Sequence, residues 1–136
     1  MTMLTIDPIE MGLPKAHHYL LGAVGPRPIC FASTIDENGV PNLAPFSFFN
    51  VFSSNPPIAI FSPARSGRTG KQKDTYNNVK KVAEVVINLV DYKMVEQMSL
   101  ASSPYDPEIN EFIKSGFTPI ESENIKPLRV KESPVQ

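Results

Sequence analysis

Short apolar runs separated by turns rich in proline and glycine dominate this sequence and predict strands more often than helices. Residues 28–35 carry apolar side chains on both faces, which is typical of a strand buried on both sides. Residues 36–39 read DENG, a hairpin signal, so residues 40–44 should return antiparallel to the first strand. Further strands are predicted at residues 58–62, 82–89 and 117–120.

Helical spacing is confined to short segments. A helix is predicted from Asp74 or Thr75 to residue 81, and two more at residues 95–102 and 107–115, the last followed by Gly116 as a stop. Residues 1–19 have no clear period and contain two prolines, so we expect an extended arm with a short helical turn near 15–21. Residues 121–136 predict no helix or strand that would end the domain, as in a chain cut within its fold.

Composition favours one β-dominated domain over residues 1–136, with an arm at 1–20. Fourteen prolines against seven glycines suit turns and strand edges better than helices. The net charge of −1 gives no reason to expect nucleic acid or a membrane as partner. The single cysteine, Cys30, excludes an internal disulfide, and no apolar run approaches the roughly 18 residues of a membrane span. Without a signal-peptide pattern, we expect a cytoplasmic protein.

No catalytic or metal-binding constellation is visible. His17 and His18 are adjacent, so their side chains diverge, and no cysteine or carboxylate cluster lies beside them. The chain also lacks a G-x-S-x-G elbow, an H-E-x-x-H helix, a C-x-x-C pair and a nucleotide-triphosphate loop. We therefore expect no metal and no catalytic side chain, so that any redox chemistry would belong to a bound cofactor.

Residues 42–50, NLAPFSFFN, combine aromatic, amide and hydroxyl side chains in one short stretch. Pro45 removes a ladder donor, so we expect a strand that ends near Ala44, followed by a tight loop. Such a loop can present backbone amides and the Ser47 hydroxyl to a flat, polar-edged ligand between phenylalanine rings. Phenylalanines that merely pack into the core would produce the same pattern, and this stretch alone does not separate the two.

Residues 63–81 form a strongly basic segment, with a net charge of +5 in a chain whose total is −1. Its cationic side chains are Arg65, Arg68, Lys71, Lys73, Lys80 and Lys81. The segment leads into the predicted helix, and a helix N-terminus suits a phosphate. We expect Asp74 to cap the helix and hold the loop, whereas Thr75 can bond either the loop or an anion. A solvated loop without a ligand is the alternative.

Six pieces of the sequence, in order between about residues 26 and 90, carry a resemblance to a known family. They are Arg27-Pro28-Ile29 opening a strand that ends Ser33-Thr34, the Gly39 hairpin, residues 42–50, Asn55-Pro56-Pro57, Lys73-Asp74-Thr75 with Asn78, and residues 84–88. Together they resemble the flavin reductase-like proteins with an FMN-binding split barrel. The resemblance implies a Greek-key type β-barrel, usually a homodimer, that holds FMN, or sometimes FAD, near the subunit interface.

The resemblance also implies where a flavin would lie. Residues 28–34 would run beside the isoalloxazine and ribityl groups, residues 47–50 would bond the ring edge, and residues 73–75 would sit at the phosphate. The implied cofactor-binding residues are Pro28, Ile29, Cys30, Ser33, Thr34, Ser47, Phe48, Phe49, Asn50, Lys73, Asp74 and Thr75. We expect the loop backbone, with Ser47 and Asn50, to contact the flavin while the aromatic rings anchor the loop.

The implied activity is that of an NAD(P)H-dependent flavin reductase. NADH or NADPH would deliver hydride to the flavin, which would reduce an acceptor or serve a partner monooxygenase. Two other interpretations stay open: a non-catalytic flavin-binding electron carrier, and a small β-barrel interaction module without cofactor. Members of the family usually continue with strands that close the barrel, and no such segment is found here, so those strands are expected to be missing.

Overall fold

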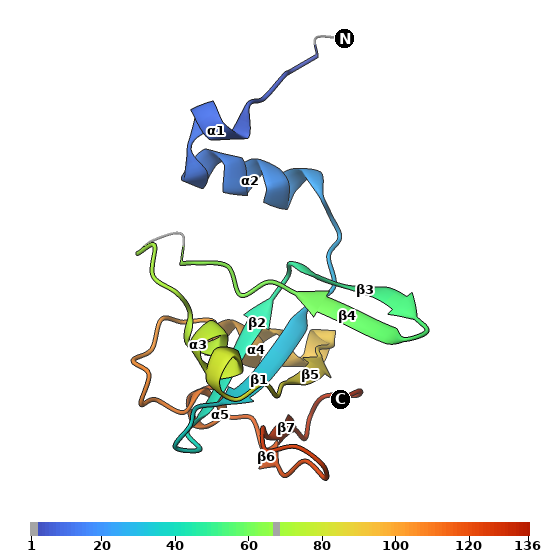
Figure 1. Ribbon diagram of the computed structural model, residues 1–136, viewed down its shortest axis with the longest axis vertical. Coiled ribbons are helices and arrows are strands. Elements are labelled where there is room, and N and C mark those ends of the chain that lie inside the picture. Colours follow the sequence, from blue (N-terminus) through green and yellow to red (C-terminus); the bar gives the residue numbers. More distant parts are fainter. Residues whose placement is uncertain (1–2, 67–68) are drawn as a thin grey trace.

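Three antiparallel sheets carry the part of the chain that the computed structural model describes, residues 3–66 and 69–136 (Figure 1). The strands are β1 (Cys30–Ile35), β2 (Pro41–Phe46), β3 (Phe49–Ser54), β4 (Pro57–Phe61), β5 (Val86–Leu89), β6 (Pro119–Ile120) and β7 (Arg129–Val130). The helices are α1 (Pro8–Met11), α2 (Leu13–Ala23), α3 (Asp74–Lys81), α4 (Val95–Ala101) and α5 (Glu111–Ser115), with a 3₁₀ turn, η1, at Tyr92–Met94. The sheet-rich architecture with short helices confirms the predicted fold class.

The central sheet has the order β2-β1-β5, and every residue of β1 is buried, as predicted for a strand covered on both faces. The hairpin to β2 is also confirmed. Its turn is held by the Asp36 carboxylate, which accepts from the N–H groups of Asn38 and Val40, both at 2.8 Å. Gly39 adopts a φ of +84°, a conformation in which only glycine is free of strain.

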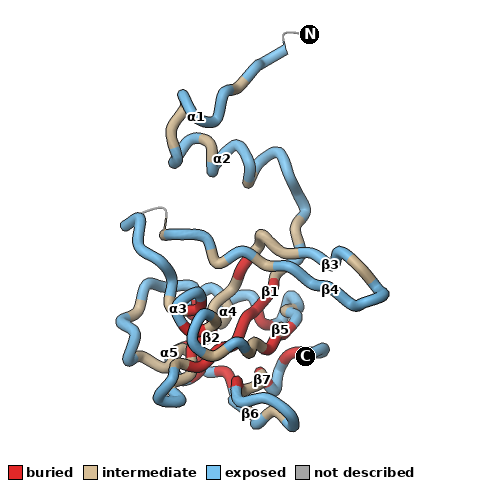
Figure 2. The backbone as a smooth tube through the Cα atoms, in the orientation of Figure 1, coloured by how far each residue is buried: buried red, intermediate tan, exposed pale blue. Residues whose placement is uncertain are grey.

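The two faces of β1 enter different hydrophobic clusters because successive side chains alternate. Phe31 lies in the main core with residues from β2, the helices after β5 and the C-terminal segment: Leu43, Met94, Ala101, Phe112, Phe117 and Val130. Cys30 and Ala32 lie in a smaller cluster with Phe46. Figure 2 shows buried residues concentrated around this sheet, while β3, β4 and the N-terminal arm are largely exposed.

β2 runs further than predicted. We expected it to end near Ala44, but it continues through Pro45 to Phe46, and β3 begins at Phe49. Because β2 is an edge strand, the donor that Pro45 lacks is not needed by a neighbour on that side. The predicted loop is therefore a turn at residues 47 and 48, and β3 pairs with β4 in a two-stranded ribbon that the sequence did not reveal.

The helical turn expected near residues 15–21 is part of a longer helix, α2, and a second helix, α1, lies before it, so the described part of the arm is less extended than predicted. Pro8 and Pro14 both occupy first turns, where the missing N–H has no intrahelical partner to lose. The Asp7 carboxylate caps α1 by accepting from the Ile9 N–H at 2.8 Å. No residue of α1 or α2 is buried, and both helices stand away from the sheets (Figure 1).

The helices after β5 follow the predictions with shorter bounds. The helix expected at 107–115 begins only at Glu111, because the Asn110 side chain caps it by accepting from the Phe112 N–H at 3.0 Å. Gly116, with φ +74°, ends this helix as predicted. The final segment, expected to lack an ending element, contains β7, which pairs with β6. None of the described helices has both the length and the apolar character needed to span a membrane.

Candidate functional site

The first turn of α3 is attached to the central sheet by a buried polar network. The Asn42 amide nitrogen on β2 donates to Thr34 Oγ1 at 3.2 Å and to Thr75 Oγ1 at 2.9 Å. Asn78 donates to the same Thr34 oxygen at 3.2 Å, one turn further along α3. All four side chains are buried, and burial of polar groups is tolerated because they bond one another. Thr75, expected beside a phosphate, is thus only 1% exposed.

The start of α3 carries an uncapped N-terminus and a lysine. Lys73, not Asp74 as predicted, is the N-cap residue, and its side chain makes no capping hydrogen bond. Its ammonium instead lies 5.0 Å from the centroid of the Phe46 ring, a cation–π contact. Desolvation lowers the pKa of Lys73, since burial disfavours the charged form. An uncapped helix start beside a cation is suited to an anion.

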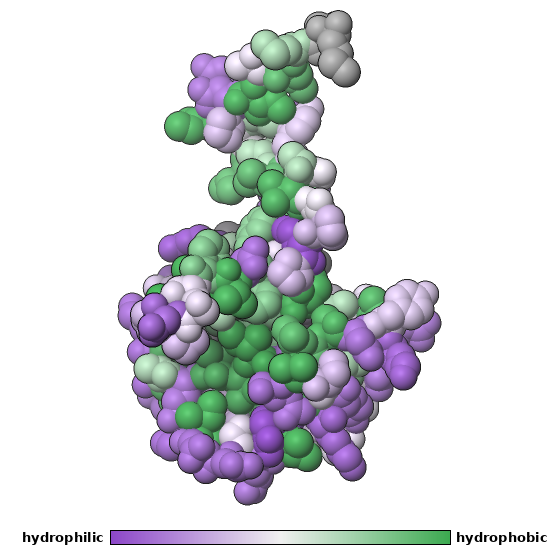
Figure 3. Space-filling view, turned by 90° about the vertical axis from the view of Figure 1, so that its right-hand side faces the viewer, coloured by the Kyte–Doolittle hydropathy of each residue, from purple (hydrophilic) through white to green (hydrophobic). Residues whose placement is uncertain are grey.

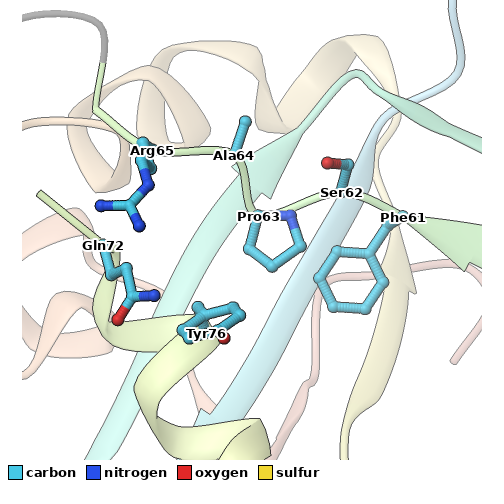
Figure 4. A pocket seen from close by; sticks show the side chains of 7 residues that line it. All are labelled: Phe61, Ser62, Pro63, Ala64, Arg65, Gln72 and Tyr76. Atoms are coloured by element: carbon cyan, nitrogen blue, oxygen red, sulfur yellow. The ribbon is translucent and has the colours of Figure 1, made fainter. Parts of the chain in front are cut away.

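A pocket of about 410 Å³ opens beside this helix start, and we call it the basic pocket. It is lined by Phe61, Ser62, Pro63, Ala64, Arg65, Gln72 and Tyr76. Figure 4 shows the side chains of Arg65, Gln72 and Tyr76 directed toward the same space, with the Pro63 and Phe61 rings beside it. Arg65 Nη1 also donates to the Gly70 carbonyl at 3.2 Å. Arg68, counted in the predicted basic segment, lies outside the described residues.

A second pocket, of about 350 Å³, lies between the arm and the β2–β3 turn, and we call it the aromatic pocket. Its lining residues are Val24, Pro26, Arg27, Pro28, Ser47, Phe48, Phe49, Asn50, Phe52 and Ile60. Five of the twelve residues predicted to bind cofactor therefore meet here. The aromatic and basic pockets share no lining residue, so the described residues for which the resemblance implied one flavin site are divided between separate pockets and positions outside them.

Arg27 organises the aromatic pocket, and its role was missed by the sequence analysis. Its Nε donates to Ser47 Oγ at 3.3 Å, and its Nη1 donates to the carbonyls of Leu21, at 2.7 Å, and Val24. The guanidinium thus ties the end of α2 to the β2–β3 turn. A second tie is the His17 ring, edge-on to Phe48 with 5.8 Å between centroids. One feature of the sequence could have indicated this role of Arg27: apart from the histidines, it is the only acidic or basic side chain in residues 16–35.

The remaining predicted residues line neither pocket. Cys30 is fully buried, and burial raises the pKa of its thiol to about 12, so it stays protonated at neutral pH. Ser33 points to the opposite face of β1 from Thr34, toward the main core, where its buried hydroxyl has no hydrogen-bond partner among the described residues. The partly buried Ile29 also lies outside both pockets.

Glu111 is a second residue that the sequence analysis missed. Its carboxylate accepts from the Leu43 N–H of edge strand β2 at 3.1 Å and so connects α5 to the strand that carries Asn42. Burial raises the pKa of Glu111, and the nearby negative charge of Asp74 acts in the same direction. Nothing in the local pattern marks this acid, because its partner is 68 residues away.

The family model of the flavin reductase like domain matches residues 23–136. The chain belongs to this family. The predicted family resemblance is thereby confirmed. The solved structure of component B of nitrilotriacetate monooxygenase from Bacillus cereus is similar to this chain, with 35% sequence identity and a TM-score of 0.86. That comparison covers 98% of this chain and 65% of the other.

Other proteins are also similar to this chain. The 2-nitrobenzoate 2-nitroreductase NbaA of Pseudomonas fluorescens has 29% identity and a TM-score of 0.76, over 96% of this chain and 61% of that one. A split-barrel protein from Shewanella frigidimarina, at 24% identity and a TM-score of 0.72 over 92% of this chain and 61% of that one, shows the shared fold. An uncharacterized Aquifex aeolicus protein is 44% identical over 117 residues, 85% of this chain. The chain spans 59% to 63% of the length of the first three curated relatives it matches.

Proposed function

We propose that this protein binds FMN and, with NADH or NADPH as electron donor, acts as a flavin reductase. One observation carries the proposal: a flavin reductase-like chain presents an aromatic pocket with polar turn residues and a basic pocket beside an uncapped helix start. FMN has a flat ring with a polar edge at one end and a phosphate at the other. Both volumes fall in the roughly 300–1,000 Å³ range of small-molecule pockets.

The two ends of the cofactor have different needs, and different residues meet them. At the ring end, Ser47 and Asn50 offer hydrogen bonds to the isoalloxazine edge, and Pro28 with the phenylalanines supplies apolar walls. At the phosphate end, Lys73, Arg65 and the first N–H groups of α3 supply positive charge and donors. This division favours FMN over riboflavin. FAD, which carries a second phosphate and an adenosine, is the alternative cofactor that the same chemistry admits.

The protein's own side chains would position the cofactor rather than transfer protons. When bound, a flavin accepts a hydride from a nicotinamide and passes electrons on. Among the described residues that line the aromatic pocket, Arg27 is the only one with an ionisable side chain, and it is engaged with Ser47 and two carbonyls. The Cys30 thiol, with a pKa of about 12, supplies no nucleophile. The residues would therefore hold and orient the flavin and exclude water from it.

A second copy of the chain would cover the exposed apolar surface next to the aromatic pocket. Val51 and Phe52 on β3 are 66% and 65% exposed, and Leu20 and Val24 on α2 are 55% and 58% exposed. Figure 3 shows hydrophobic surface continuing from the arm onto the side of the body toward which the β3–β4 ribbon projects. Contiguous exposed apolar surface of this kind marks interaction sites. We propose a homodimer that completes the walls of the flavin site.

The proposed electron acceptor is a partner monooxygenase or another soluble acceptor. The similarity to a protein named as component B of nitrilotriacetate monooxygenase supports this part of the proposal, because that name describes one component of a larger oxygenating system. Co-purification with a monooxygenase, or reduced flavin delivered to one in a reconstituted assay, would support it. A reductase that passes electrons only to dissolved oxygen would contradict the partner and leave the reductase activity intact.

The test begins with the purified protein and a titration of FMN, followed by flavin absorbance and fluorescence. We expect saturable binding, and then FMN-dependent oxidation of NADH or NADPH in steady state. Absence of flavin binding would overturn the proposal in favour of an interaction module. Flavin binding without turnover by either nicotinamide would instead indicate the electron-carrier alternative.

A further inference from the structure

We propose that Asn42 is a positioning residue for the phosphate end of the flavin, and that it acts by fixing the start of α3. The inference rests on the proposed function and concerns how the chain distinguishes a phosphorylated flavin from riboflavin. Asn42 itself is 8% exposed and lines neither pocket. Its influence must therefore pass through the groups that it holds.

The Asn42 amide joins two different elements with its two N–H groups. One donates to Thr34 Oγ1 on the central strand β1, and the other donates to Thr75 Oγ1 in the first turn of α3. Thr75 is separated from the N-cap Lys73 by one residue. One amide on β2 therefore determines where α3 begins relative to the sheet, and with it the position of the Lys73 ammonium over the Phe46 ring.

The buried side chains by which α3 contacts the sheet are polar. The two residues of α3 that are buried are Thr75 and Asn78, and both bond side chains of the sheet. Apolar packing tolerates small slides between surfaces, whereas hydrogen bonds weaken steeply when their geometry changes. Removal of the Asn42 bonds should therefore let the start of α3 shift, while the Asn78 bond to Thr34 keeps the helix attached.

A shift of this kind should affect one end of the flavin only. Lys73, Gln72 and Tyr76 belong to the α3 start or to the basic pocket, and none of them lines the aromatic pocket. Binding of a phosphate depends on donors held at fixed positions, because charge-assisted hydrogen bonds are both strong and directional. Riboflavin lacks the phosphate and depends on the ring end. The affinity ratio of the two ligands therefore reports the position of α3.

The experiment measures the dissociation constants of FMN and riboflavin for the Asn42→Ala variant by flavin fluorescence. We expect FMN affinity to fall about tenfold, which is the loss of one charge-assisted contact, and riboflavin affinity to change less than about twofold. Thr34→Val removes the hydroxyl that accepts from both Asn42 and Asn78, so it releases Asn42 from β1 and loosens α3, and it should also lower the ratio of FMN affinity to riboflavin affinity. Thr34→Ser keeps the hydroxyl and should therefore show the wild-type ratio of FMN affinity to riboflavin affinity.

Asn88→Ala provides the matched control. Asn88 is also a fully buried asparagine of the central sheet, but it lies on β5 and bonds the Phe31 carbonyl and the Val130 N–H, both at 2.9 Å. Its loss should lower stability without changing the affinity ratio. An equal change of the ratio in Asn88→Ala, or equal losses of both ligands in Asn42→Ala, would overturn the inference.

Two further outcomes keep the inference separate from the proposed function. If wild-type protein prefers FMN and both Asn42→Ala and Thr34→Val retain that preference, the inference is wrong and the proposed function stands. If wild-type protein binds neither flavin, both are wrong. Should Asn42→Ala fail to fold, Thr34→Val decides the question by the same ratio.

Discussion

At the scale of single residues, Glu111 shows how a half-buried carboxylate can work against stability. Its folded-state pKa is raised, first by burial, so the folded protein binds the proton more tightly than the unfolded chain does. The contribution of Glu111 protonation to the free energy of unfolding is therefore complete below the pKa of a glutamate in the unfolded chain. It is lost as the pH rises through the raised pKa of the folded state. At neutral pH the ionised group lowers stability, offset in part by its bond from the Leu43 N–H.

We expect Glu111→Gln, which keeps an acceptor for Leu43 and removes the charge, to be at least as stable as wild type at pH 7. The difference should shrink as the pH falls toward 4, because wild-type Glu111 then becomes neutral as well. Urea unfolding midpoints of both proteins across this range measure it. A difference independent of pH would show that the charge is not responsible.

Glu132 supplies a control of opposite sign. Burial acts to raise its pKa, but hydrogen bonds from Thr118 and other groups lower it overall. Its contribution is therefore present at neutral pH and is lost as the pH falls through the depressed folded pKa. In Glu132→Gln the loss of stability should shrink toward low pH, so the two variants should converge on wild type from opposite sides.

At the scale of elements, the start of α3 gathers the features proposed to hold a phosphate. Lys73→Ala should weaken FMN binding about tenfold, since a hydrogen bond to a charged group contributes roughly 1.5–3 kcal/mol, and should leave riboflavin binding nearly unchanged. Lys80→Ala, at the other end of the same helix, is the matched control. Fluorescence titration of both variants with FMN and with riboflavin measures these affinities. Equal sensitivity of FMN binding to both lysines would indicate a diffuse charge effect rather than a site.

The β1–β2 hairpin depends on the backbone of one glycine. At Gly39 an added Cβ would meet no atom within 4 Å, so the cost of Gly39→Ala comes from its φ of +84° alone. We expect a loss of about 1–2 kcal/mol in the free energy of unfolding. At Gly22 on α2 an added Cβ would also meet no atom within 4 Å, and the residue has no positive φ. Gly22→Ala should therefore be neutral or stabilising by up to about 1 kcal/mol. Chemical denaturation measures both, and equal effects would contradict this explanation.

At the scale of the whole molecule, the arm and the β3–β4 ribbon leave apolar side chains without partners in one chain. If a second copy covers them, Phe52→Asp should shift the protein from dimer to monomer, because a charge in an apolar interface has no compensating partner. Ile113→Asp, on α5 and 75% exposed, is the matched control and should leave the dimer intact. Light scattering with size-exclusion chromatography gives the masses. A wild-type monomer would refute the proposed homodimer.

Several features of this molecule are determined by local sequence. The β1–β2 hairpin follows from a run that is apolar on both faces and from a glycine at the one position that needs a positive φ. The stop at Gly116 was predicted for the same reason, since turn and cap preferences act over a few residues. The bounds of α3 were also predicted, although its N-cap is Lys73 and not Asp74. The family resemblance, now confirmed, rested on six such local pieces in the right order.

Other features were decided only by the tertiary structure, because they depend on partners distant in the sequence. Pro45 could lie within β2 because that strand is at a sheet edge, which no local pattern records. Ser33 and Thr34 are adjacent, yet alternation sends one to the main core and the other to the polar network. Thr75 bonds Asn42, 33 residues earlier, and so is buried in the polar network. The sequence by itself thus identified the flavin reductase-like family, and the packing of α3 and the ribbon on the sheet determined which of the candidate residues line the two pockets.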